Sequence, residues 1–427
     1  MHHGAPHWTP VAFSCLGALA VLVVAACSGT TPTRNGFGSG GGGSGGGQDP
    51  GSSSGGGSGG TDDGGPSGNF GDDGGSRPNP LCQYDDGTDH DGDGFSGTDG
   101  DCNDCDPNAN PGAFDVPKNG VDEDCDGVPD DEPSLCDTSV ALDSNDGMDA
   151  AKAIGLCRQT SETATGKQRT WGVVGASYVM CDGSPAVASA NFPLGHGLLS
   201  KLGVNVPLEG KHMLAISSGT ARDPTDPGYQ DVGGFDKGFT CTPPSGYPKE
   251  SPACPGVTTG QPHDCVALRL VIRVPTNAKS FAYNENFFTY EFPDYICSTY
   301  NDFFVAMMTP KLANLPDGNI AFDQAGNPVS VNNSLLQVCT AQTAGGKTFA
   351  CPLGASTLSA TGFDGHAATG WLKTQAPVDT LKGKDVTLMF AVWDSGDGVL
   401  DSSALVDDFV WSVDPASGAT TVPNPPQ

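Results

Sequence analysis

An acidic stretch between Asp85 and Glu132 constrains what this chain can fold into more than any other feature. It holds 17 aspartates and glutamates, three cysteines and one lysine, Lys118, and many of its acids are followed by glycine. Carboxylates at this density repel one another unless a positive charge neutralises them. Acids at alternate positions, followed by glycine, present their oxygens to one centre. The stretch therefore predicts a metal-binding module with little hydrophobic core.

Two loop registers lie within this stretch. In a calcium loop, side chains at positions 1, 3 and 5 and a carbonyl at position 7 supply oxygens, and glycine at position 6 makes the turn. Position 12 of the first loop is Gly100 instead of the closing glutamate of an EF-hand, and no amphipathic helices flank it, so we reject that fold. The predicted ligands are Asp89, Asp91, Asp93, the Phe95 carbonyl, Asp99 and Asp101 in the first loop, and Asp122, Asp124, Asp126 and Asp130 in the second.

Four strings in order resemble the MopE-type metal-binding motif of secreted and surface proteins, notably of myxobacteria: DGDG at 91–94, DCNDCDP at 101–107, NPGA at 110–113 and NGVDEDCDG at 119–127. The resemblance covers about residues 85–132 and implies a bound metal. Where the motif often has a cysteine, this chain has DVPK at 115–118, and Cys105 is a candidate for the missing partner. The family's name is associated with copper. One histidine, His90, no methionine and many hard oxygens favour Ca²⁺ here.

Two other readings of the module stay open. Cys102 and Cys105 have a spacing that could bind zinc, but no second pair stands at ligand spacing. A solvated acidic spacer without metal is the other reading, but a spacer does not need glycine and cysteine at fixed offsets. The cofactor we expect is Ca²⁺, with copper or zinc as alternatives.

The N-terminus predicts export. Residues 11–26 are nearly all apolar, a run that is short for a membrane span and typical of a signal peptide. The string VAAC at 24–27 resembles a lipobox, which implies that Cys27 carries the lipid of a bacterial lipoprotein. An ordinary signal peptide cut nearby is the alternative. We expect signal peptide and lipobox over 1–27, membrane attachment through the lipid, and a location at the outer membrane or cell surface.

Residues 28–80 consist mostly of glycine, serine, aspartate and proline, so we expect a disordered linker that holds the folded part away from the membrane. The formal net charge of −30 argues against nucleic acid and against an anionic lipid surface as partners.

Fifteen cysteines in an exported chain predict disulfides. Cys15 and Cys27 belong to the leader and the lipid site. Eight cysteines of the C-terminal region could form four bridges among themselves. The five of the acidic module leave one thiol free or paired with the other region, and they are Cys82, Cys102, Cys105, Cys125 and Cys136.

Beyond Thr138, apolar and aromatic residues alternate between turn residues, which predicts a mainly β fold. We expect a small module over 81–136, held together by calcium loops and disulfides. A jelly-roll-like β-sandwich follows over 137–415, with a tail over 416–427. The expected strands lie over 266–274, 280–290, 302–308, 385–393 and 404–411, and the expected helix over 148–156.

Several strings of this region resemble the choice-of-anchor L domain, a surface-protein family of unassigned biochemistry, over about residues 145–413. They are GHGLL at 195–199, LAISSGT at 214–220, FAYNENFFTYEFP at 281–293, YNDFF at 300–304 and AVWDSGDGVLDSSAL at 391–405. The resemblance implies a domain displayed at the cell surface, here anchored by the N-terminal lipid.

Acids of the expected sandwich form a second candidate metal site. Jelly-roll-like domains bring an early and a late strand side by side, so acids on both could converge. The alternative is turn chemistry, because an Asp-Ser-Gly-Asp-Gly loop forms without metal. The candidate ligands are Glu291, Asp302, Asp394, Asp397 and Asp401.

We expect no enzyme activity. The sequence lacks the His-Glu-x-x-His, Gly-x-Ser-x-Gly and phosphate-loop motifs. Glu291 with Asp394 could form a glycosidase pair, but paired acids in a β-sandwich are more often calcium ligands. The expected function is a surface lipoprotein with a structural calcium module and a sandwich that binds glycan, matrix or a cell-surface protein for adhesion. The alternatives are copper or zinc sequestration at the surface, and an envelope structural component.

Overall fold

The structure, a computed structural model, describes residues 82–131, 135–333 and 335–424. The predicted signal peptide, the lipidation site Cys27 and the linker over 28–80 lie outside the described residues. The chain is mainly β with an irregular, disulfide-bonded acidic part, as predicted. None of the helices in the described ranges is long and apolar enough to cross a membrane.

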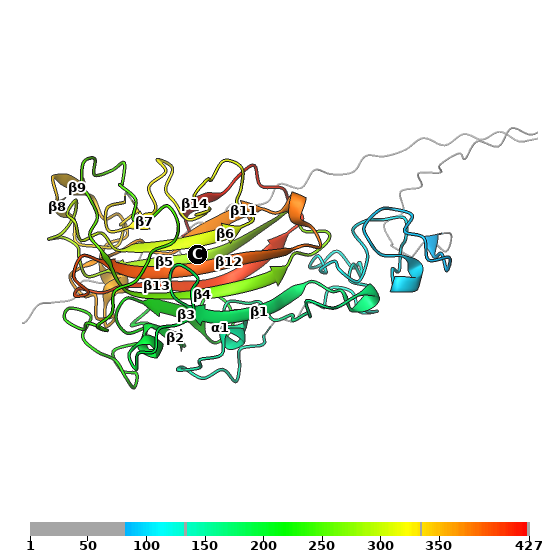
Figure 1. Ribbon diagram of the computed structural model, residues 1–427, viewed down its shortest axis with the longest axis horizontal. Helices are drawn as coiled ribbons and strands as arrows, with labels where there is room; N and C mark the ends of the chain where they lie inside the picture. The colour runs from blue at the N-terminus through cyan, green and yellow to red at the C-terminus, as the bar shows by residue number, and fades with distance from the viewer. Residues whose placement is uncertain (1–81, 132–134, 334, 425–427) are drawn as a thin grey trace, which may run out of the picture. The chain divides into compact units, whose positions relative to one another are not determined.

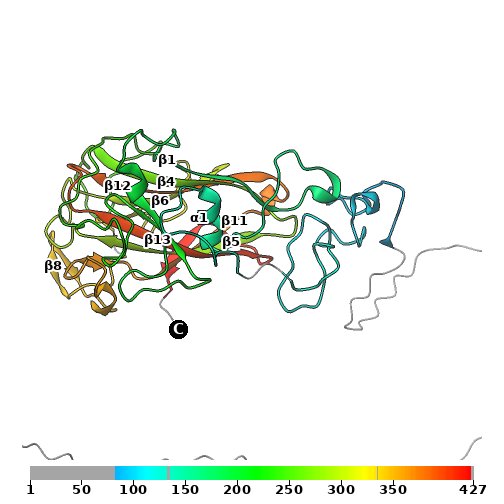
Figure 2. The same ribbon diagram turned by 90° about the horizontal axis from the view of Figure 1, so that it is seen from below.

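Two antiparallel sheets stack face to face (Figures 1 and 2). The first sheet has the order β1 (Gly172–Val179), β4 (Pro262–Arg273), β12 (Asp385–Ser395), β6 (Phe303–Thr309) and β7 (Val329–Ser330). The second has the order β14 (Thr420–Pro423), β11 (Leu372–Pro377), β5 (Ser280–Thr289), β13 (Ser402–Ser412), β3 (Met213–Ser217) and β2 (His196–Leu199), and β10 (Ala367–Ala368) also pairs with β5. A separate hairpin joins β8 (Gln342–Ala344) to β9 (Lys347–Phe349).

The core lies between the two sheets. Tyr283 of β5 meets Phe390 of β12 edge to face, with 4.9 Å between ring centroids, and Phe303 stacks on Trp393 at 5.0 Å. Every residue of β5 is buried, because the strand is central in its sheet and both of its faces are covered. The packed core therefore fixes the positions of the residues at the ends of its strands.

One short helix, α1 (Gly147–Ala153), packs against β1, β4 and β3 and so touches both sheets (Figure 2). The side chain of Asp146 accepts a hydrogen bond from Met148 N at 2.9 Å and caps the helix. Ala150, Ala151 and Ala153 are buried, and such small side chains let the helix approach closely.

The predicted strands correspond to β4, β5, β6, β12 and β13 and are confirmed. The predicted helix over 148–156 is confirmed but ends earlier, at Ala153. The tail predicted over 416–427 is wrong in part, because β14 pairs with β11 and extends the sheet. Thr374 and Thr421 are buried there with their hydroxyl oxygens 2.7 Å apart. Because this contact is polar, no pattern of apolar residues in the sequence indicates the strand.

The acidic module has little regular structure beyond the 3₁₀ turn η2 (Gly97–Asp99). It packs on the sandwich through specific hydrogen bonds. Asn277 Nδ2 donates to the Phe114 carbonyl at 2.7 Å and Phe114 N donates to Asn277 Oδ1 at 3.1 Å. Thr276 Oγ1 lies 2.7 Å from Asn110 Oδ1. The module is therefore positioned by the β4–β5 turn of the sandwich.

Among the described cysteines, the bridges are Cys82–Cys105, Cys102–Cys125, Cys136–Cys157, Cys241–Cys265, Cys254–Cys297 and Cys339–Cys351. The prediction of disulfides is confirmed. The prediction of four bridges within the C-terminal region is wrong, because three of the described bridges lie within it. The odd cysteine of the module, Cys136, pairs with Cys157 of the sandwich region. Cys181 is left as a buried thiol, because it points into the apolar core, with Sγ 3.2 Å from the Val392 carbonyl.

Candidate metal centres

The first loop is closed by the carboxylate of Asp89. Its Oδ1 accepts from Gly92 N at 2.6 Å and its Oδ2 accepts from Gly94 N at 3.0 Å. Both glycines have positive φ, 86° and 98°, which other residues adopt only with strain. Asp89 thus folds the chain back on itself and brings the following acids together.

Asp91, Asp93 and Asp101 converge, with one carboxylate oxygen of each within 4.8 Å of the others. In each residue Oδ1 accepts from a backbone amide: Asp93 N at 3.2 Å, Phe95 N at 2.8 Å and Asn103 N at 2.7 Å. The Oδ2 atoms of all three are buried and have no hydrogen-bond partner among the described residues. One oxygen of each acid holds the loop, and the other faces the cluster.

Three ionised carboxylates without a cation would be unfavourable in this cluster. Burial, followed by the neighbouring carboxylates, raises the pKa of Asp93 to about 7 and that of Asp101 to about 6, and it raises the pKa of Asp91 as well. Unpartnered buried carboxylate oxygens are costly. A hard cation would satisfy all three at once, so the residues fit a metal that binds through oxygen.

Asp104 was not predicted, although it forms a group with Asp89 and Asp91. It is fully buried, accepts from His90 N at 2.7 Å, and its Oδ2 lies 3.0 Å from His90 Nδ1. Burial raises the pKa of Asp104, but the hydrogen bonds from His90 outweigh this effect and the pKa lies below its usual value. Its position between Cys102 and Cys105 is the only sequence signal that could have pointed to it.

The second loop repeats the hydrogen-bond pattern of the first, with Asp122 in the place of Asp89. The bonds equivalent to those of the first loop run from Gly127 N to Asp122 Oδ2, from Asp126 N to Asp124 Oδ1 and from Val128 N to Asp126 Oδ1, at 2.9, 3.1 and 2.9 Å. The two registers predicted from the sequence therefore adopt the same local fold.

The acids that converge in the second loop are Asp122, Asp124 and the unpredicted Asp115. Asp115 Oδ1 accepts from Glu123 N at 2.8 Å, which places this carboxylate under the loop. The Arg158 guanidinium of the sandwich region forms an ion pair with Asp124 Oδ2. The second loop therefore has a guanidinium beside its acids, whereas the group beside the acids of the first loop is the imidazole of His90.

Three of the predicted ligands serve as turn residues. Asp99 accepts from Ser96 Oγ at 2.7 Å, Asp126 accepts from Val128 N, and Asp130 accepts from Asn119 N at 3.0 Å. None of them belongs to the acidic groups found within the described ranges. The Phe95 side chain is buried and lies against Gly112, where a Cβ would come within 2.9 Å of the ring, and ligation by its carbonyl stays a prediction.

Two disulfides cross the module. Cys82–Cys105 and Cys102–Cys125 each join residues 23 apart and fix the segment of Asp101 and Asp104 between the two loops. The alternative of zinc at Cys102 and Cys105 is wrong, because both sulfurs are in disulfides and no thiolate remains to bind the metal.

Comparison with known proteins supports metal binding by this module. A family model described as "Putative metal-binding motif" (Cu-binding MopE) matches residues 101–131. The chain is similar to this family over that segment, which suggests metal binding. The match contains Asp101, Asp104 and the second loop, and it begins after Asp91 and Asp93. A search of curated proteins finds no match to the chain.

The acids predicted within the sandwich divide into two sets. Glu291, Asp302 and Asp394 converge, with one oxygen of each within 4.8 Å of the others, and all three are buried. Asp401 is buried, and its Oδ1 lies 3.5 Å from Ser218 Oγ. Asp397 is exposed and accepts from Val399 N at 3.0 Å, as a turn residue does.

Proposed function

We propose that this chain is an exported surface lipoprotein in which Ca²⁺ is a structural metal of the acidic module and the β-sandwich binds a glycan for adhesion. The observation that carries the calcium part is the convergence of three buried, unpartnered Oδ2 atoms from Asp91, Asp93 and Asp101. A single cation at this point would be a partner for all three carboxylates at once.

The ligand chemistry favours calcium over copper or zinc. Every candidate ligand in the first loop is a hard oxygen, and the module contains no methionine. The cysteines are in disulfides, and His90 offers a single imidazole, whose Nδ1 pairs with Asp104 and whose ring stacks on Tyr84 at 4.1 Å. Sequestration of copper or zinc lacks a comparable set of soft ligands.

A structural role follows from the small core of the module. Its buried apolar residues are few, namely Cys82, Phe95, Ala109, Ala113 and Phe114. Segments of this size need metals or disulfides to replace a core. Bound calcium would hold the loops in place, and the bonds of Asn110 and Phe114 would transmit that order to the sandwich.

Calorimetric titration of the metal-stripped, oxidised protein tests the calcium site. We expect saturable Ca²⁺ binding and a higher melting temperature, because a ligand that binds only the folded state stabilises it. Asp93→Asn with Asp101→Asn should weaken this binding at least 10-fold. Asp99→Asn, in the same loop but outside the cluster, should not. Tight copper or zinc binding with indifference to calcium would favour sequestration instead.

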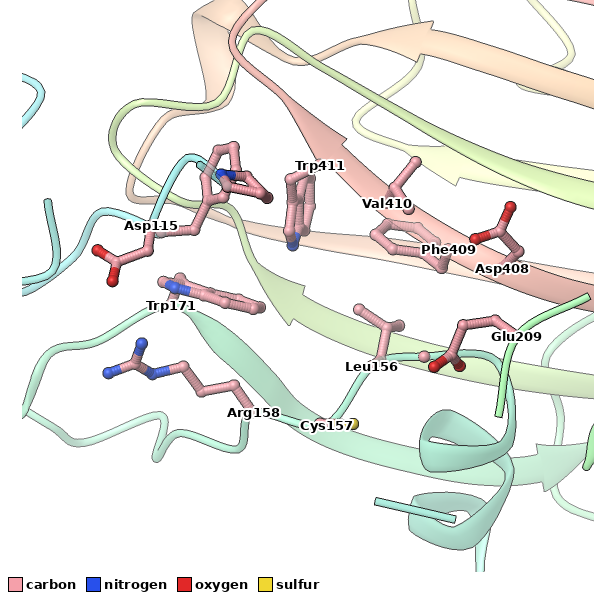
Figure 3. A pocket seen from close by; sticks show the side chains of 13 residues that line it. Asp115, Leu156, Cys157, Arg158, Trp171, Glu209, Asp408, Phe409, Val410 and Trp411 are labelled. Atoms are coloured by element: carbon pink, nitrogen blue, oxygen red, sulfur yellow. The ribbon is translucent and has the colours of Figure 1, made fainter. Parts of the chain in front are cut away.

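A pocket of about 300 Å³ supports the glycan part (Figure 3). Trp171 and Trp411 line it edge to face with centroids 6.3 Å apart. Glu209 and Asp408 lie at one end, as Figure 3 shows. Aromatic faces stack on sugar rings and carboxylates accept hydrogen bonds from hydroxyl groups, so this lining suits a carbohydrate.

Binding to an array of bacterial and matrix glycans tests the pocket. We expect Trp411→Ala to reduce the signal at least 10-fold, because it removes a wall of the pocket. Val422→Ala, at an exposed position on β14 outside the pocket lining, should leave binding unchanged. Equal binding by both variants, or none by the parent protein, would contradict a glycan site here.

The surface location rests on the lipobox at Cys27 and on the resemblance of residues 145–413 to choice-of-anchor L domains. Both belong to the proposal, as do the bacterial outer membrane and the absence of enzyme activity. An exported chain agrees with the six disulfides among the described residues.

A further inference from the structure

A second group of carboxylates lies between the two sheets of the sandwich. Trp393 pairs with Phe303 in the register of β12 and β6, which places the next residue of β12, Asp394, beside Asp302. Glu291 follows the end of β5 in the other sheet. The three side chains are at most 1% exposed and their oxygens converge within 4.8 Å. The topology therefore gathers acids from both sheets at one point.

Several oxygens of these acids have no hydrogen-bond partner among the described residues. Neither oxygen of Asp394 nor Oε2 of Glu291 has a hydrogen-bond partner within the part of the chain that the structure describes. The Gly398 amide lies close enough to lower the pKa of Asp394, but without hydrogen-bond geometry. Asp302, in contrast, accepts from Ser395 N at 2.9 Å and from Ser402 Oγ at 2.6 Å, so its position is fixed.

The surrounding charges do not neutralise the group. Burial, and then the charges of other carboxylates, raises the pKa of Glu291 to about 9 and those of Asp302 and Asp394 well above the usual value. The nearby buried Asp401 also has an unpartnered Oδ2. The buried ammonium of Lys237 acts first on Asp264 and then on Asp401 and Asp394, and its Nζ donates to the Ser217 carbonyl at 2.8 Å. One lysine cannot balance four buried acids.

We propose that Glu291, Asp302 and Asp394 bind a hard divalent cation, Ca²⁺, which joins the two sheets at this end of the sandwich. The ligands are carboxylate oxygens, the donors that calcium prefers. Glu291 contributes from the sheet of β5, and Asp302 and Asp394 contribute from the sheet of β6 and β12. This site is independent of the calcium loops of the acidic module and of the glycan pocket.

The number of calcium ions bound per chain tests this site. The measurement uses the full chain in an Asp93→Asn, Asp101→Asn background, so that failure of the module site and failure of this site are distinguishable. Asp394→Asn in this background should lose one bound Ca²⁺ after equilibrium dialysis and elemental analysis. Asp397→Asn, exposed in the loop that follows β12, should lose none. An unchanged calcium count in Asp394→Asn would overturn the proposal.

Thermal unfolding separates a ligand from a residue needed only for folding. In chelator, Asp394→Asn should melt at or above the temperature of its parent, because the substitution removes a buried acid whose oxygens have no partner among the described residues. With calcium, the parent should gain several degrees and the variant should not. A lower melting temperature in chelator with the calcium gain retained would make Asp394 purely structural. If this variant does not fold, Glu291→Gln is measured in its place, with the same outcomes required.

Discussion

Asp93 uses its two oxygens differently. Oδ1 accepts a backbone hydrogen bond that shapes the loop, and Oδ2 is buried without a partner. Asp91 and Asp101 share this division. The alternate spacing of the loop predicted Asp91 and Asp93, since local backbone geometry brings them together. Asp104 and Asp115 reach their clusters through disulfides and through contacts between loops, which a local pattern does not encode.

His196 gives the fold a dependence on acid. Its ring is buried, stacks on Tyr178 at 3.6 Å and lies near Arg222 and Lys237. Burial, and then these two cations, lowers the pKa of His196 to about 3. The unfolded chain therefore takes up a proton on this residue as pH falls below 6.5, and the folded chain does not. The free energy of unfolding is therefore unaffected by this residue above pH 6.5, and it decreases as the pH falls from 6.5 towards 3.

His196→Gln should flatten that dependence. Between pH 7 and pH 4.5, we expect the free energy of unfolding of the variant to fall by about 2–3 kcal/mol less than that of the parent protein. Denaturant unfolding at both pH values measures the difference. Parallel pH profiles for the two proteins would show that His196 is protonated within the fold.

Two of the strands that the sequence did not predict, β1 and β14, differ in composition from those that it did predict. β4, β5, β6, β12 and β13 carry runs of apolar and aromatic residues. β1 reads GVVGASYV, and β14 reads TTVP. Glycine and serine interrupt the apolar residues of β1, and half of β14 is threonine. Each becomes a strand because a neighbouring strand offers its edge. Tertiary context, and not local propensity, forms these elements.

The contact between α1 and β1 depends on the absence of a side chain at Gly147. A Cβ there would lie 2.5 Å from the backbone of Ala176 and Ser177, which cannot move without disturbing the sheet. Gly147→Ala should therefore destabilise the fold by about 1–3 kcal/mol. Gly175→Ala is the control, because a Cβ at that position meets nothing within 4 Å. Thermal unfolding of the two variants compares them, and equal melting temperatures would show that α1 shifts freely.

At the scale of the whole molecule, the sequence predicted an acidic module followed by a β-sandwich. Their mutual contacts could not be predicted. The ion pair of Arg158 with Asp124 and the Cys136–Cys157 bridge join residues whose patterns belong to different regions. The convergence of Glu291 with Asp302 and Asp394 was foreseen as a candidate site, but the register of β6 and β12 was needed to place them together.

The proposed attachment to a membrane also belongs to the scale of the whole chain. If Cys27 carries a lipid, Cys27→Ala should move the protein from the membrane fraction to the soluble extract, and labelling with a radioactive fatty acid should be lost. Fractionation with immunodetection measures both forms. Cys15→Ala, within the apolar run, should remain in the membrane fraction. Equal distribution of the Cys27→Ala variant and the parent would argue for an ordinary signal peptide.

The disulfides of the module limit how far it can be stretched. Between Cys82 and Cys157, an unbridged chain could extend to about 250 Å. With the bridges Cys82–Cys105, Cys102–Cys125 and Cys136–Cys157 intact, the shortest covalent path consists of three disulfide crossings and two peptide segments, 102–105 and 125–136, and its full extension is about 65 Å. If the proposed adhesion holds, a pull between the cell and a bound glycan would act along this short path. The metal loops would stay within a nearly inextensible strap.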